Sequence, residues 1–186
     1  MNRQTYCDLS VFGLLIALGV VGRWAQPEWN FTPLVAVAAM GGYYFRSLLP
    51  AALAPIGVLA ISDLALPAHV SLPVQASVYL MMLLPLALGR RARKTDGWQR
   101  VGYVAACGVV PATLFFVVTN FAVWMFQSDY AMTLPGLVEC YARAIPFYRS
   151  MLAGDIFYVT MLFGGLAAAT MPVRRPAPAW ARIQKK

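Results

Sequence analysis

The chain has 186 residues, of which 60% are hydrophobic and only 12% are charged. A soluble domain of this size could not bury so much apolar surface, so the composition excludes one and indicates a protein dissolved in lipid. The formal net charge of +8 would suit a nucleic-acid-binding protein, but the positions of the basic residues indicate a membrane topology instead.

The first apolar segment covers residues 9–25 and follows a short polar N-terminus. Arg3 could be the basic region of a signal peptide, but no A-x-A cleavage site follows it. The segment ends instead in Arg23 and Trp24, residue types that are common at a membrane interface. We therefore predict a first transmembrane helix that is retained in the protein.

Five further apolar segments follow, and a helix needs ~20 residues to cross ~30 Å of hydrocarbon. The second segment is short and contains Gly41 and Gly42, so it either ends in a tight hairpin at Arg46 or re-enters the membrane from one side in a four- or five-span protein. We expect an all-α integral membrane protein with six transmembrane helices in one domain, 1–172, and a basic cytoplasmic tail, 173–186. The expected spans are 9–25, 32–45, 48–66, 72–89, 101–126 and 147–171.

The lysines and arginines predict the orientation of this bundle. If the N-terminus is inside, twelve of the 15 basic residues lie on the inner side, as the positive-inside rule requires, and only Arg23, Arg143 and Arg149 lie outside. We therefore expect a multi-pass protein of the bacterial cytoplasmic (inner) membrane with both termini in the cytoplasm. Its charge then reflects contact with anionic lipid, and no nucleic-acid partner is expected.

The longest outer loop covers residues 127–146 and carries apolar residues at helical spacing. Pro135 lies near the start of this pattern and Pro146 follows it, which favours a short interfacial helix between the two prolines.

Polar side chains gather at one depth, within about two turns of the predicted outer face, where their burial is costly and their position informative. Asp155 lies in the sixth span and needs a partner from another helix, since Arg149 is on a different face. Asn120 and Trp124 are four residues apart and share a face of the fifth span. The pattern predicts either an outward-facing pocket or a polar cluster that only joins the helices.

The candidate ligand-binding residues all lie toward the outer face. They are Asn30, Thr32, Asp63, Asn120, Trp124, Tyr141, Arg143, Arg149, Asp155 and Tyr158. Each also has a structural interpretation, such as an interfacial position for Asp63 and the arginines or helix packing for Asn120. Three dispersed cysteines and a single histidine predict no disulfide framework, no metal site and no cofactor.

Five short motifs carry a resemblance to a known group of proteins. They are Asn30-Phe31-Thr32-Pro33, Gly41-Gly42-Tyr43-Tyr44-Phe45, Thr119-Asn120-Phe121-Ala122-Val123-Trp124, Tyr141-x2-Ala144-Ile145-Pro146-Phe147 and Gly154-Asp155-x2-Tyr158. Over residues 9–170 the chain resembles an uncharacterised family of small bacterial six-helix membrane proteins. That family is in turn similar to the S components of energy-coupling factor (ECF) vitamin transporters.

The resemblance implies a six-helix bundle that binds a vitamin or related small molecule near its outer face. S components work with a coupling protein and two ATPases, and this chain has no P-loop of its own. Their first helix often carries an Ala-x3-Ala docking motif, of which Gly13 and Ala17 are a looser version. The cobalamin branch uses a cysteine at the start of the fourth span, and residues 71–77 contain none, so cobalt ligation is not expected.

We therefore expect a substrate-binding transport subunit, which is not an enzyme. A structural or regulatory membrane subunit without a transport role is the alternative. A minor alternative is an intramembrane hydrolase in which Asp63 and Asp155 share a proton and activate water.

Overall fold

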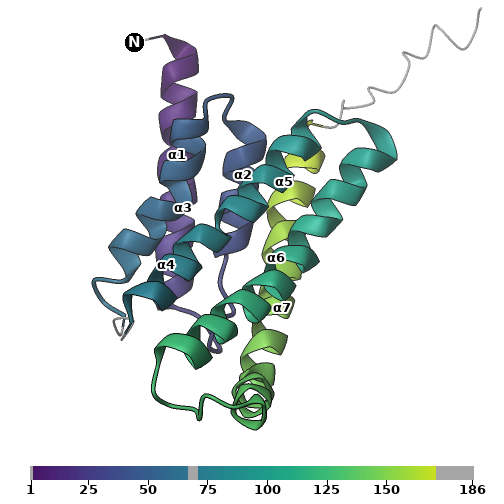
Figure 1. The fold of residues 1–186 in the computed structure, drawn as a ribbon. Helices are drawn as coiled ribbons and strands as arrows, with labels where there is room; N and C mark the ends of the chain where they lie inside the picture. The colour runs from purple at the N-terminus through teal and green to yellow at the C-terminus, as the bar shows by residue number, and fades with distance from the viewer. Residues whose placement is uncertain (1, 67–70, 171–186) are drawn as a thin grey trace, which may run out of the picture.

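The computed structural model describes residues 2–66 and 71–170, and all regular structure in these ranges is helical (Figure 1). The predicted tail, 173–186, lies outside the described residues. The helices are α1 (Arg3–Trp24), α2 (Leu34–Tyr44), α3 (Leu48–Ser62), α4 (Leu72–Met81), α5 (Leu83–Arg93), α6 (Gly97–Phe126) and α7 (Leu134–Thr170).

Four helical stretches are long and apolar enough to cross a membrane. They are α1, α6, α7 and the continuous stretch Leu72–Arg93, which joins α4 to α5. The remaining two, α2 and α3, have 11 and 15 residues and would span about 17 and 23 Å at 1.5 Å per residue. The described residues are therefore all-helical, as predicted, and four of their helical stretches are compatible with a membrane location. The six predicted crossings would also require the two shorter helices to span the membrane.

The fourth predicted span, 72–89, is divided at Met82 between α4 and α5. Pro85 explains the division, because a proline nitrogen cannot donate the hydrogen bond to the carbonyl four residues earlier, here that of Met81. Membrane helices tolerate such breaks where neighbouring protein covers the backbone. Pro85 and Leu86 are both buried in the bundle.

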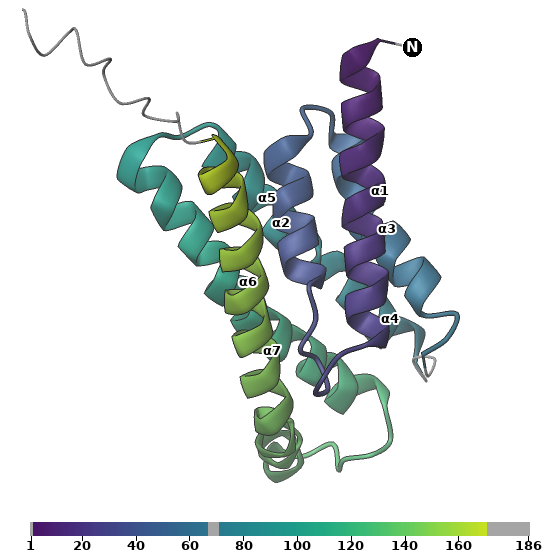
Figure 2. The same cartoon turned by 180° about the vertical axis from the view of Figure 1, so that it is seen from behind.

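Helix α2 is the centre of the bundle and packs against α1, α3, α5, α6 and α7. Figure 2 shows it between α1 on one side and α7 on the other. Every residue from Leu34 to Gly42 is buried, as expected for a helix that is apolar on all faces. Because α2 is enclosed by protein, it need not be as long as a helix that faces lipid.

Glycines permit the close contact between α2 and α5. A Cβ atom on Gly42 would overlap with the carbonyl oxygen of Leu86, and one on Gly89 would overlap with that of Ala39. Small residues at facing positions let two backbones approach closely, which is the usual basis of helix association in membranes. This contact holds α5 against the central helix.

The predicted short helix in the last outer loop is not a separate element. Its residues form the first part of α7, which begins at Leu134 and continues through Pro146 to Thr170. In Figure 1 the first turns of α7 are seen nearly end-on while the rest runs along the bundle, so the helix bends. A proline inside a helix is a common cause of such a bend.

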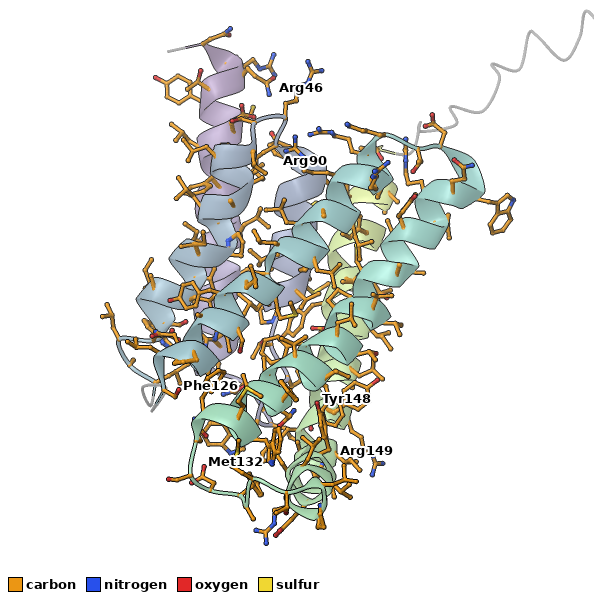
Figure 3. The ribbon with its side chains drawn as sticks, viewed as in Figure 1. Arg46, Arg90, Phe126, Met132, Tyr148 and Arg149 are labelled. Atoms are coloured by element: carbon orange, nitrogen blue, oxygen red, sulfur yellow. The ribbon has the colours of Figure 1, made fainter. Side chains whose placement is uncertain are left out.

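The two ends of the bundle differ in chemistry. The start of α1, the end of α5 and the last described turn of α7 lie at one end, where Figure 3 shows Arg46 and Arg90. Phe126, Met132 and Arg149 lie at the opposite end, together with the end of α3 and the start of α4 (Figure 3).

Candidate functional site

A cavity of about 210 Å³ lies at the end of the bundle away from Arg46 and Arg90. Its position follows from the length of α2, which begins at Leu34, well short of the ends of the neighbouring α1 and α7. Leu34 and Val35, the first residues of α2, line the cavity, and the loop between α1 and α2 lies over this shortened end. The short central helix thus leaves the space in which a ligand could lie.

Polar side chains reach the cavity from three parts of the chain: the end of α1 with the following loop, the end of α3, and α7. They are Arg23, Gln26, Asn30, Thr32, Asp63 and Asp155. The rest of the wall consists of apolar side chains from α2, α3, α4, α6 and α7, together with Trp29, Leu66 and Met82. A mostly apolar pocket with a few convergent polar groups is the usual form of a small-molecule site.

Arg23 and Asp63 form an ion pair at the rim of this cavity, with Nη1 of the arginine 2.7 Å from Oδ1 of the carboxylate. Arg23 also donates to Oγ of Ser62, and Tyr79 donates to the other oxygen of Asp63 at 3.4 Å. The two charged side chains are only 14% and 18% exposed. The carboxylate of Asp63, which follows α3, is therefore bonded to side chains of α1 and α4.

Asp155 lies deeper and is 2% exposed. Its Oδ2 atom has no hydrogen-bond partner among residues 2–66 and 71–170. The sequence led us to expect a partner from another helix, and the described part of the chain supplies none. A buried carboxyl group without a partner is energetically costly, so this is the least satisfied polar group of the cavity.

The loop that covers the cavity is held against α7 at Gly154, the residue before Asp155. A Cβ atom on Gly154 would lie 3.1 Å from Cα of Phe31 and 3.2 Å from the nitrogen of Thr32. The ring of Phe31 packs against Tyr158, with 5.7 Å between the ring centroids. Asn30 has a positive φ of 68° and donates its backbone N–H to the side chain of Gln26. The loop therefore has a defined conformation directly above Asp155.

Of the ten predicted ligand-binding residues, four line this cavity: Asn30, Thr32, Asp63 and Asp155. Tyr158 does not line the cavity, but its ring contacts Phe31 in the loop between Asn30 and Thr32. The structure does not bring the other five to the cavity.

Three of those five donate hydrogen bonds to backbone carbonyl groups of α6 or of the loop that follows it. Tyr141 donates to the carbonyl of Val117 at 2.7 Å, and Trp124 donates to that of Ala131 at 3.0 Å. Asn120 donates to the carbonyl of Phe116 within its own helix. These bonds give the three side chains a role in packing.

Arg143 and Arg149 lie on the outside of α7. Arg143 pairs with Glu139 at 2.7 Å on an exposed face. Arg149 lines a separate depression with Glu28 and Ser150, and Ser150 donates to the carboxylate of Glu28 at 2.9 Å. Gly13 and Ala17, the predicted docking residues, are both exposed on α1, and a Cβ atom on Gly13 would contact nothing within 4 Å.

No cluster of three or more metal-binding side chains occurs among the described residues. The structure adds Arg23 and Gln26 to the cavity, which the sequence analysis had not selected. Arg23 had a recognisable signal, because a basic residue at the outer end of the first span and an acidic residue at the outer end of the third were predicted at similar depth. Opposite charges at one depth of a membrane bundle commonly pair.

Comparison with known proteins gives one match: the model of a family of unknown function (DUF6580) matches residues 3–179. No curated protein and no solved structure matches the chain.

Proposed function

We propose that this chain, which belongs to the DUF6580 family, is a membrane-embedded substrate-binding subunit for uptake of a vitamin or related small molecule. The observation that carries the proposal is the cavity under the α1–α2 loop, where polar side chains from three parts of the chain converge within an apolar wall. Small-molecule sites in helical bundles are built in this way, from side chains on facing helices.

We infer that this cavity faces the outer side of the bacterial inner membrane. The end of the bundle opposite the cavity carries most of the described basic residues, namely Arg3, Arg46, Arg90, Arg91, Arg93, Lys94 and Arg100. Under the positive-inside rule this end faces the cytoplasm. The start of α1 and the last described turn of α7 then both lie inside, and the ligand enters from outside.

Six crossings fit this arrangement if α2 and α3 each count as a span. Neither is long enough to cross hydrocarbon in contact with lipid, but α2 is buried on all sides from Leu34 to Gly42. Non-helical backbone at membrane depth is tolerated where protein or a cavity surrounds it. The loop 25–33 completes the α2 crossing and forms the roof of the cavity.

We propose that the bundle works as an ECF S component does, with its ligand near the outer face beneath the loops. The energy for uptake would come from a coupling protein and ATPases, since the chain contains no P-loop. The exposed small residues Gly13 and Ala17 on α1 would then contact the coupling protein.

A hydrolytic role for Asp63 and Asp155 has weaker support. An aspartyl dyad needs two carboxyl groups that share one proton. The carboxylate of Asp63 is instead bonded to Arg23 and Tyr79. We therefore propose a binding protein and no catalytic role.

Ligand-induced thermal stabilisation tests the proposal. The purified protein is screened against water-soluble vitamins and nucleobases, because a ligand that binds only the folded state raises the unfolding temperature. Val78 lines the cavity and Val21 is exposed on α1, so Val78→Phe should abolish the stabilisation while Val21→Phe should retain it. A structural or regulatory subunit would show no stabilisation with any compound.

A further inference from the structure

Resting on this proposed binding function, we infer that the cavity takes a compact organic cation, which donates an N–H hydrogen bond to the carboxylate of Asp155. Among vitamin-like compounds, the ligand is then a nitrogen-bearing cation with a small apolar body. Compounds that would enter the cavity as carboxylates or phosphates are excluded.

The charges that line the cavity give the first reason. Three charged side chains reach it: Arg23, Asp63 and Asp155. The first two neutralise each other at 2.7 Å, so the positive charge of Arg23 is already matched. The polar groups that remain, such as Gln26 and Thr32, are uncharged. Asp155 is therefore the one acidic group at the cavity without a basic partner in the described part of the chain.

The burial of Asp155 gives the second reason. At 2% exposure its carboxyl group has lost nearly all contact with water, and its Oδ2 atom receives no hydrogen bond from residues 2–66 or 71–170. An ionised carboxylate in such surroundings needs a cation and hydrogen-bond donors to offset its desolvation. A ligand with a protonated nitrogen supplies both, whereas an anionic ligand would add a second uncompensated negative charge.

The N-terminus of α2 favours an anionic group in the cavity, but its effect is weaker than that of the Asp155 carboxylate. Leu34 and Val35 begin this helix and line the cavity, and no side chain caps them. The end of a helix carries a partial positive charge of roughly half a unit. Its free N–H groups can donate to a polar group of the ligand, but a partial charge does not reverse the sign set by the full unit charge of the Asp155 carboxylate.

The size and walls of the cavity limit the rest of the ligand. A volume of about 210 Å³ is larger than the ~150 Å³ of an engineered apolar cavity that binds benzene, so a single-ring compound can fit. Leu59, Phe115 and Met151 supply apolar wall on three different helices. A ligand whose ring packs against this wall and whose cationic group points toward Asp155 matches both the apolar and the acidic part of the cavity.

Binding of three matched probes tests the inference: benzylammonium, benzyl alcohol and benzoate, which share a ring and differ in charge. Ligand-observed saturation-transfer NMR on the purified full-length protein detects weak binding, and protein-free micelles correct for partitioning into detergent. The wild type should bind benzylammonium more tightly than benzyl alcohol and should not bind benzoate. Asp155→Asn should weaken benzylammonium binding by about ten- to hundredfold, the usual contribution of a charge-assisted hydrogen bond, and should leave benzyl alcohol unchanged.

Two variants complete the design. Glu139→Gln removes an acid from the same helix on an exposed face outside the cavity, and it should leave all three affinities unchanged. Asp155→Glu retains the charge and should keep the preference for the cation even if Asp155→Asn does not fold.

Benzoate binding as tight as benzylammonium binding, or equal benzylammonium binding by the wild type and a folded Asp155→Asn protein, would overturn the inference. So would a wild type that binds none of the probes. The proposed function is judged separately by the vitamin and nucleobase screen: a neutral or anionic compound that stabilises the wild type but not Val78→Phe would preserve it while the cation assignment fails. An absence of stabilisation by any compound would count against the binding function itself.

Discussion

The guanidinium group of Arg23, at the end of α1, lies 2.7 Å from the carboxylate of Asp63, which follows the end of α3. The two residues are 40 positions apart in the sequence and close the rim of the cavity. Trp24 donates to the carbonyl of Ser62 at 3.3 Å and adds a second link between the same two helix ends. The wall of the candidate site is thus also a contact that holds α1 against α3.

Removal of either charge should destabilise the bundle. Arg23→Gln leaves Asp63 as an uncompensated and largely desolvated carboxylate. We expect a loss of about 2–3 kcal/mol, between the values for buried and exposed ion pairs, because both side chains retain some contact with solvent. Denaturant unfolding of the purified protein in micelles measures the loss.

The double variant Arg23→Gln/Asp63→Asn should lose less stability than the sum of the single variants, with a coupling free energy of about 1–2 kcal/mol. Arg143→Gln breaks the exposed pair with Glu139 and should cost at most about 0.5 kcal/mol. Strict additivity of the Arg23 and Asp63 substitutions would mean that the pair contributes nothing.

The close contact of α2 and α5 should be intolerant of a single added methyl group. In Gly89→Ala the new Cβ atom overlaps with the carbonyl oxygen of Ala39, which is backbone and cannot rotate away. We expect a loss of about 2–3 kcal/mol from overpacking. Gly164→Ala, where the new atom contacts nothing within 4 Å, should be neutral or slightly stabilising, because alanine favours helix. Equal stability of the two variants in thermal unfolding would refute the packing of α5 on α2.

The apolar segments of the sequence predict this fold better than its prolines do. Apolar segments mark helices well, because any long apolar stretch must be helical in lipid, and the described helices fall close to the predicted spans. The division of α4 from α5 at Met82 was not predicted, although Pro85 indicates it. The continuation of α7 through Pro146 was also missed, because a proline predicts a helix end in water more reliably than in a membrane bundle.

The candidate site was only partly predictable for a different reason. Depth along a span can be estimated from the sequence, which predicted similar depth for Asn30, Asp63 and Asp155, and all three line the cavity. The rotation of a helix about its axis decides which side chains face the cavity. This rotation is set by packing and cannot be read from the sequence. Asn120 and Trp124 therefore lie at the right depth but bond within α6 and to the following loop.

Cysteine labelling tests the proposed orientation. Met132 and Arg46 are exposed at opposite ends of the bundle (Figure 3). In a Cys7→Ser background, which removes the exposed native cysteine, a membrane-impermeant maleimide applied to intact spheroplasts should label Met132→Cys and not Arg46→Cys. Permeabilised membranes should allow labelling of both. Labelling of Arg46→Cys in intact spheroplasts would place the basic end outside and reverse the direction of the site.

The α1–α2 loop should loosen when its contact with α7 is crowded. In Gly154→Ala the added Cβ atom would lie 3.1 Å from Cα of Phe31, so the loop must move away by a few tenths of an ångström. Amide hydrogen exchange across residues 26–32 should then be faster, since local opening requires less free energy. Gly165→Ala, whose Cβ atom has free space, serves as the matched control and should leave exchange in this loop unchanged. Unaltered exchange in Gly154→Ala would mean that the loop does not depend on this contact.

Mass spectrometry of the intact protein, released from native membranes with its bound small molecules, tests the central claim most directly. The account predicts a single compact compound on the wild type that is absent from Val78→Phe, in which the cavity is filled, and still present on Val21→Phe. A wild type that carries no small molecule after growth in rich medium, or a compound that Val78→Phe retains in full, would contradict a binding site in this cavity.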